Sequence, residues 1–203
     1  MSVILQGIRW ETYENLLCDL QDRRNPRLAF DKGVLEVMSP LPRHERRSNI
    51  LEEMVTLLAE ERAINIENFG SMTLKNPAQE RGVEPDGCFY IQSVSCLPEN
   101  LGDPDPQTLP PPDLIIEVDH THPSLDKFPI YAGLGVSEIW HDDGIRVTIY
   151  RREETHMVES EDSVAFPGVR GEDITRFLTS SETMRRLDWT DTFRQWVRGG
   201  SEE

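Results

Sequence analysis

The spacing of apolar side chains changes several times along the chain, and each change predicts an element. Apolar residues recur at helical spacing over residues 10–20 and again over residues 43–62, so both stretches are predicted as helices. Between them, two apolar runs flank an Asp-Lys-Gly turn at residues 31–33, which predicts a β-hairpin. The second helix carries His44 on its apolar face, where a polar side chain needs a partner or a function.

The remaining apolar runs predict a sheet. Residues 64–74, 83–91 and 114–119 are predicted as strands, and the last is a dense β-branched run typical of a buried central strand. Residues 98–113 hold six of the 14 prolines and are predicted as a surface excursion. The predicted elements that follow are a short helix through Lys127 and Tyr131, a hairpin formed by residues 136–141 and 146–151, and two short helices from about residue 166.

In this order the elements predict an α/β or α+β fold in which helices cover a mixed β-sheet. The length of 203 residues suits a single domain over the whole chain. An aromatic stripe on the last predicted helix is interpreted as core or as a dimer face rather than as a ligand site. The stripe consists of Trp189, Phe193, Trp196 and Val197.

Composition narrows the class of protein. The chain has 21 basic and 37 acidic residues, a formal net charge of −16, so it should repel polyanions unless a local basic surface or bound cations intervene. No apolar run approaches the roughly 20 residues that span a bilayer, and we expect neither membrane insertion nor a secretory signal. Three cysteines without CxxC spacing predict a reducing, cytoplasmic location.

Strand alternation decides which acidic side chains can meet. Glu117 and Asp119 leave the third predicted strand on the same face, and Asp86 shares a face of the second strand with Glu84. Ionised carboxylates buried without a partner cost roughly several kcal/mol, so we expect a cation or a cleft there. Hard oxygen ligands suit Mg²⁺ or Mn²⁺, and Lys127 would orient a metal-activated water. The alternative is that these strand ends only face solvent.

Two histidines leave a different metal site open. His120 and His122, with Glu117, are similar to an H-x-H site for a transition metal. The third imidazole would be His44, His141 or His156. An H-x-H metal site of this kind occurs in cupin-like barrels, whose sequences show a glycine-rich pattern of many short strands. The chain lacks that pattern, so surface-loop histidines are the favoured interpretation.

Several basic residues are candidate phosphate contacts, because arginine forks suit phosphate geometry. They are Arg43 and Arg47 at the start of the long helix and Lys75 near a strand end. The alternative is that they only solvate the surface. The sequence holds no helix-turn-helix or C₂H₂ motif, so it gives no basis for arguing which nucleotide sequence would be recognised.

The order and spacing of five segments resemble the Uma-two family, which is similar to PD-(D/E)-x-K nucleases and is usually described as "putative restriction endonuclease". The segments are residues 33–40 with His44, 82–86, 112–119, 124–127 with Tyr131, and 135–140. The resemblance runs from about residue 10 to residue 151. It implies a restriction-endonuclease-like core over residues 10–151, followed by a strand and helical extension over residues 152–203.

The resemblance also implies roles for single residues. Asp86 matches the aspartate of the PD element, Glu117 the acidic residue of the next strand, and Lys127 the lysine. A metal ion would lie on Asp86, Glu117 and the backbone carbonyl of Val118. Asp119 stands where nucleases of this type normally have the lysine, and Lys127, arriving from the next helix, would replace that lysine by geometry. Asp119 is a further candidate metal ligand, and it would strengthen metal binding if Lys127 did not reach the metal. His44 matches a histidine that opens the long helix; Glu36, Glu45 and Glu52 are further candidate acids.

Two functions therefore compete. The first is a Mg²⁺- or Mn²⁺-dependent nuclease, with Asp86, Glu117, Lys127 and His44 in the catalytic site and nucleic acid, expected to be DNA, as the substrate. The second is a catalytically inactive module on the same fold that binds nucleic acid or a protein partner. A homodimer is expected in either case.

Overall fold

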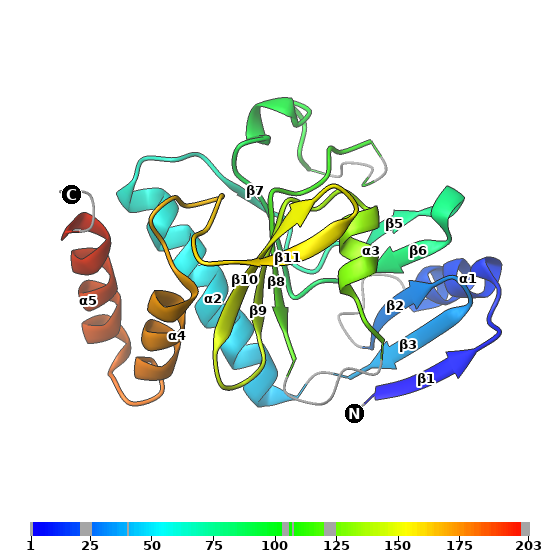
Figure 1. Ribbon diagram of the computed structural model, residues 1–203, viewed down its shortest axis with the longest axis horizontal. Helices are drawn as coiled ribbons and strands as arrows, with labels where there is room; N and C mark the ends of the chain where they lie inside the picture. Colours follow the sequence, from blue (N-terminus) through cyan, green and yellow to red (C-terminus); the bar gives the residue numbers. More distant parts are fainter. Residues whose placement is uncertain are drawn as a thin grey trace.

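The computed structural model describes residues 2–20, 26–39, 41–102, 106, 108–119 and 125–199. The chain forms two β-sheets with helices against their faces (Figure 1). The helices are α1 (Trp10–Leu20), α2 (Pro42–Glu61), α3 (Phe128–Gly133), α4 (Gly171–Ser180) and α5 (Arg186–Gly199), with short 3₁₀ helices at Pro77–Gln79 and Val94–Cys96. The strands are β1 (Ser2–Gln6), β2 (Arg27–Asp31), β3 (Val34–Met38), β4 (Glu67–Asn68), β5 (Leu74–Asn76), β6 (Arg81–Val83), β7 (Gly87–Tyr90), β8 (Leu114–Val118), β9 (Glu138–Asp142), β10 (Val147–Glu153) and β11 (His156–Ser160).

The smaller sheet has the strand order β1-β3-β2-β6-β5 and is antiparallel throughout. Its centre is the predicted hairpin of β2 and β3, whose turn places Lys32 and Gly33 at φ values of 45° and 93°, as a two-residue hairpin requires. Helix α1 covers one face, where Tyr13 stacks on Phe30 with 5.2 Å between ring centroids. Gly82 lies so close to the Tyr13 ring that a side chain there would collide with it.

The larger sheet has the strand order β11-β10-β9-β8-β7-β4, with β8 and β9 parallel and the other neighbours antiparallel. Helices α2, α4 and α5 cover one face, and α3 lies on the other (Figure 1). Leu114, Ile116 and Val118 pack in the core under α2, whereas Ile115 packs with α3. The predicted alternation along this strand is therefore confirmed, and the α+β class with it.

The predicted mixed sheet is the larger one, but a second, antiparallel sheet accompanies it, and two predicted strands are divided between the two sheets. Residues 83–91 are not one strand: β6 ends at Val83 in the smaller sheet and β7 begins at Gly87 in the larger one. Pro85 lies between them and has no N–H for a ladder, so the chain leaves one sheet there and enters the other. Residues 64–74 contain only β4 and the start of β5, with Gly70 at φ 55° between them.

The aromatic stripe of α5 belongs to the core. Trp189, Phe193 and Val197 are each at most 2% exposed, and Trp196 packs against the same cluster. The interpretation as core is confirmed, so the stripe is not a free face for a second copy, and the homodimer stays a prediction. Among the described helices, none is both long and apolar enough to cross a membrane.

A buried carboxyl group ties the chain after β11 to the larger sheet. Glu138 on β9 accepts hydrogen bonds from Ser163 Oγ at 2.6 Å, Trp140 Nε1 at 2.7 Å and Ala165 N at 3.2 Å, and also from the backbone of Val164. Burial raises the pKa of Glu138 above its ordinary value, and these hydrogen bonds oppose the rise. The sheet and the following segment therefore share one fully buried acceptor.

Replacing Glu138 with glutamine is expected to lower the free energy of unfolding by about 1–3 kcal/mol, because one of the two acceptor oxygens is lost. Urea titration followed by circular dichroism measures the change. Glu159→Gln on exposed β11 is the matched control and should change stability by less than about 0.5 kcal/mol. Equal effects of the two substitutions would contradict the assignment.

Candidate active site

Two acidic residues lie opposite each other where β7 and β8 pair. Asp86 directly precedes β7, and Glu117 lies near the end of β8. The antiparallel ladder pairs Gly87 with Ile116. The residue before Gly87, Asp86, therefore lies opposite the residue after Ile116, Glu117, and residues in such positions have a Cβ separation of about 5 Å. The two residues are 4% and 3% exposed. The structure thus brings together the two acids that the sequence singles out.

Glu117 is held by two donors on the α3 side of the sheet. Lys127 Nζ donates to Oε1, and Tyr131 Oη donates to Oε2 at 2.5 Å. Burial raises the pKa of Glu117, but the Lys127 charge and the two hydrogen bonds lower it by more, so the pKa lies below its ordinary value. The carboxylate is therefore ionised at neutral pH.

Lys127 comes from the segment before α3 and not, as predicted, from the helix itself. The helix begins at Phe128, since Pro129 is tolerated only in its first turn. Burial lowers the pKa of Lys127, but the charge and hydrogen bond of Glu117 outweigh it, and the pKa lies above its ordinary value. Lys127 is therefore a protonated ammonium group inside the site.

Two further acids surround the same ammonium group. Glu36 on β3 is buried, and Asp119 follows β8 and is half-buried. Both charges contribute to raising the pKa of Lys127. The Asp119 N–H donates to the carbonyl oxygen of Asp142 at 2.7 Å, which keeps Asp119 beside the sheet. Both acids therefore lie within electrostatic reach of Lys127.

Asp86 is held by partners from three different elements. The Val118 N–H donates to Asp86 Oδ2 at 2.7 Å, and His44 Nε2 lies 3.2 Å from the same oxygen. Arg27 on β2 forms an ion pair with Oδ1 and also reaches Glu45 Oε1 at 3.3 Å. Sequence reasoning missed Arg27; its signal was a basic residue at the start of an otherwise buried strand.

His44 lies beside Asp86 and within electrostatic reach of Glu117. It lies in the first turn of α2, is 6% exposed, and forms a hydrogen bond with the backbone of Val118. Burial, and then the charge of Arg27, lower the pKa of His44 below its ordinary value, while the charge of Glu117 opposes that change. The imidazole is therefore neutral at neutral pH and lies within the electrostatic reach of both acids.

Two of the three predicted phosphate contacts are engaged elsewhere. Arg47 is buried and holds Asp142 with two hydrogen bonds of 2.6 and 2.8 Å. Lys75 pairs with Glu14 at 3.0 Å on the smaller sheet. Each of these two side chains already forms an ion pair with an acid that is distant in the sequence, so neither is free to bind a phosphate. Arg43, in the first turn of α2, is exposed.

A cleft of about 520 Å³ opens beside Asp86. Helix α2 contributes Glu45 and Glu52 to its wall, and the segment between the sheets contributes Glu84. Both helix acids considered from the sequence therefore line it. With Arg27 as the cation in this wall, the cleft is acidic. Such a lining favours cations over bare phosphate.

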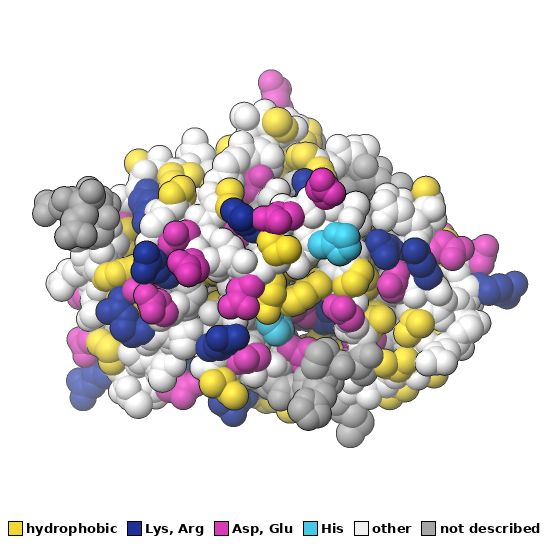
Figure 2. All heavy atoms as spheres, in the orientation of Figure 1, with side chains coloured by type: hydrophobic (Ala, Val, Ile, Leu, Met, Phe, Trp, Pro, Cys, Tyr) yellow, Lys and Arg dark blue, Asp and Glu magenta, His cyan; other side chains and the backbone are white. Residues whose placement is uncertain are grey.

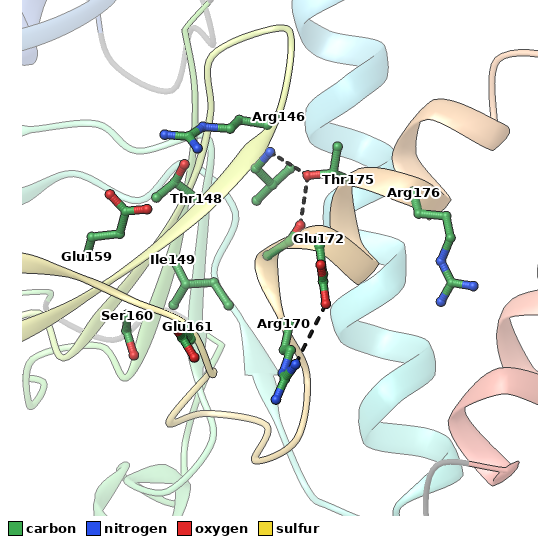
Figure 3. Close-up of a pocket in the computed structure, with 12 residues that line it drawn as sticks. Arg146, Thr148, Ile149, Glu159, Ser160, Glu161, Arg170, Glu172, Thr175 and Arg176 are labelled. Atoms are coloured by element: carbon green, nitrogen blue, oxygen red, sulfur yellow. Dashed lines mark hydrogen bonds and ion pairs between the residues drawn. The ribbon is translucent and has the colours of Figure 1, made fainter.

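A larger cavity of about 580 Å³ lies between β10, β11 and the start of α4 (Figure 3). Its arginines are largely paired with nearby acids, as in Arg170–Asp162 at 3.2 Å and Arg176–Asp173 at 2.9 Å. Asp86 does not line this cavity but lines the smaller cleft, so we place the candidate chemistry there. Glu117 and Lys127 are not among the lining residues of either space.

The histidine-metal alternative depends on residues that the structure does not describe. His120 and His122 lie outside the described ranges. His141 packs edge-on against Phe128 with 5.4 Å between ring centroids, and His156 is exposed. Within the described part of the chain, no three or more histidine, cysteine, aspartate or glutamate side chains form a group that could hold a metal ion.

A family model described as "Putative restriction endonuclease", Uma2, matches residues 10–178. The chain belongs to the Uma2 family. The match continues beyond residue 151 and includes β11 and most of α4, so the family resemblance inferred from the motifs is confirmed.

A solved structure with the same fold is described as a putative nuclease belonging to DUF820 from Anabaena variabilis ATCC 29413. The TM-score is 0.52, and 17% of residues are identical over 92% of this chain and 99% of that chain. At this identity the likeness shows a shared fold alone. No curated protein matches the chain.

The residues of this Uma2 chain fit a hard divalent cation. Mg²⁺ is usually held by one or two carboxylates and several waters, so it does not need three acidic side chains. Asp86 and Glu117 supply carboxylate oxygens on adjacent strands, and the Val118 backbone lies between Asp86 and His44. These three residues are the candidate metal ligands.

Replacing Lys127 with methionine tests the buried pair with Glu117. We expect the free energy of unfolding at pH 7 to fall by about 3–5 kcal/mol, because Glu117 is left buried without its cation. In the wild-type protein the pKa of Glu117 lies below 4.5, so this stabilisation is present above pH 4.5 and is lost as the pH falls through the folded-state pKa. In the variant, burial favours the protonated acid, so the deficit is largest at neutral pH and shrinks toward pH 4.

Urea titrations of both proteins between pH 4 and pH 8 measure the deficit. Lys75→Met is the matched control, since it breaks the more exposed pair with Glu14 and should cost no more than about 1 kcal/mol. A deficit in Lys127→Met that does not change with pH would show that Glu117 is not its cause.

Proposed function

We propose that this chain is a metal-dependent nuclease that hydrolyses phosphodiester bonds, with DNA as the expected substrate. The observation that carries the proposal is the position of Asp86 opposite Glu117, with the Lys127 ammonium group on Glu117. Membership of the Uma2 family supports a nuclease-type function. Mg²⁺ or Mn²⁺ is the proposed cofactor, held by Asp86, Glu117 and the Val118 carbonyl, with Asp119 as a further ligand.

Each residue has a distinct proposed part in hydrolysis. A bound divalent cation would polarise the phosphodiester and lower the pKa of a bound water. Lys127 is protonated, so it would orient that water and stabilise negative charge that develops on the phosphate. Tyr131 holds Glu117 in place through its hydrogen bond, and the neutral ring of His44 holds Asp86. These last two are positioning residues.

The charge of the protein restricts how it would bind nucleic acid. The net charge is −16, and Figure 2 shows acidic and basic side chains interspersed over the visible face, without a broad basic surface there. The cleft beside Asp86 is itself acidic. We therefore expect binding that requires a divalent cation, with Arg43 as the proposed phosphate contact.

Asp86→Asn separates the active nuclease from an inactive one. Asparagine has the same size and can still accept the Val118 hydrogen bond, but it removes a charged metal ligand, so cleavage should fall by about 100-fold or more. Plasmid, linear duplex, single-stranded DNA and RNA are incubated with Mg²⁺ or Mn²⁺ and analysed on gels. Asp188→Asn, at an exposed position of α5, is the matched control and should cleave as the wild type does.

The alternative function is a catalytically inactive module that binds nucleic acid or a protein partner. One observation favours it: both carboxylates already have a cation from the protein, Arg27 on Asp86 and Lys127 on Glu117. This alternative predicts no cleavage by the wild-type protein with either metal. Cleavage that Asp86→Asn loses and Asp188→Asn keeps would contradict it.

The homodimer and the cytoplasmic location stay predictions. The cysteines Cys18, Cys88 and Cys96 are free, as expected in a reducing compartment. Size-exclusion chromatography with light scattering measures the mass of the assembly directly.

A further inference from the structure

Arg27 is a buried cation on the acidic side of the site that the proposed hydrolysis does not use. It opens β2, and its side chain is 10% exposed. The guanidinium group pairs with Asp86 Oδ1, reaches Glu45 Oε1 at 3.3 Å and donates to the Pro85 carbonyl oxygen at 3.4 Å. It therefore holds the segment between the two sheets, where Asp86 is located.

The charge of Arg27 acts on several groups of the site. After burial it is the next cause that lowers the pKa of His44, and it opposes the rise that burial causes in the pKa values of Tyr131 and Glu84. Arg27 also lines the cleft beside Asp86. Arg27 forms an ion pair with Asp86, and Lys127 forms one with Glu117, so each buried carboxylate has its own cation.

The two oxygens of Asp86 are not equivalent. Oδ2 accepts the Val118 N–H and lies beside His44 Nε2. Oδ1 is the oxygen that pairs with Arg27. Because Oδ2 already faces these two nitrogen atoms, Oδ1 is the oxygen that a divalent cation would take. There it would compete with the Arg27 charge, since two cations on one oxygen repel each other.

We propose that Arg27 is a built-in counter-ion that competes with the divalent cation for Asp86 Oδ1. The proposal rests on the metal site of the proposed function. In the metal-free protein the guanidinium group neutralises Asp86, which would otherwise be a buried and uncompensated charge. When the metal binds, the guanidinium group leaves Oδ1 and keeps Glu45, whose side chain is 44% exposed at the edge of the cleft, as its partner.

Titration of the full chain with Mn²⁺ by isothermal calorimetry tests the competition. Arg27→Gln removes the competing charge, so it should bind Mn²⁺ about tenfold more tightly than the wild type. Arg27→Lys keeps the charge without the fork and should fall between the two. Arg81→Gln is the matched control: it breaks another arginine–aspartate pair of the same sheet, with Asp31 at 2.9 Å, and should leave the affinity unchanged.

A measurement on the wild-type protein covers the case in which Arg27→Gln does not fold. The side-chain N–H resonance of Arg27 should shift as Mg²⁺ saturates the protein, while that of Arg81 stays in place. An unmoved Arg27 resonance at saturation would overturn the proposal, as would equal or weaker Mn²⁺ binding by a folded Arg27→Gln variant.

Two more titrations separate this proposal from the proposed function. If Asp86→Asn and Glu117→Gln lose Mn²⁺ binding but Arg27→Gln gains none, the metal site stands and only the competition is overturned. If Asp86→Asn binds Mn²⁺ as the wild type does, the metal lies elsewhere, and the proposed function fails together with the inference.

Discussion

The buried ion pair between Glu117 and Lys127 joins the central strand β8 to the segment that leads into α3. Both groups lose most of their contact with water, and each stays charged because the other lies against it. Tyr131 adds a hydrogen bond from the next turn of the chain. The position of the ammonium group in the site, and the ionised state of the acid beside it, both depend on this pair.

The smaller sheet completes the site. Its strands β2 and β3 supply Arg27 and Glu36, one beside Asp86 and the other near Lys127. Without the smaller sheet, Asp86 and Glu117 would share a single cation, Lys127. The site therefore belongs to both sheets, and Pro85 lies at the point where the chain passes from one to the other.

Local patterns were sufficient for the residues whose direction depends on their own element. Strand alternation placed Glu117 on the face opposite Ile116, and helical spacing placed His44 on the inner face of α2. Arg27 and Arg47 could not be assigned in this way, because their partners are distant in sequence and are brought near only by sheet and helix packing. One signal was present but unused: a proline at position 85 argues against an inner strand through that position.

The split of one predicted strand into β6 and β7 has a consequence for how the molecule tolerates change. Asp86 takes its guanidinium partner from a hairpin that packs in a separate apolar cluster with α1. A relative of this chain that lost α1 and that hairpin would retain the larger core under α2. In such a relative the larger sheet would keep its shape, but its electrostatics would change. Asp86 would carry a buried negative charge without the guanidinium group that neutralises it.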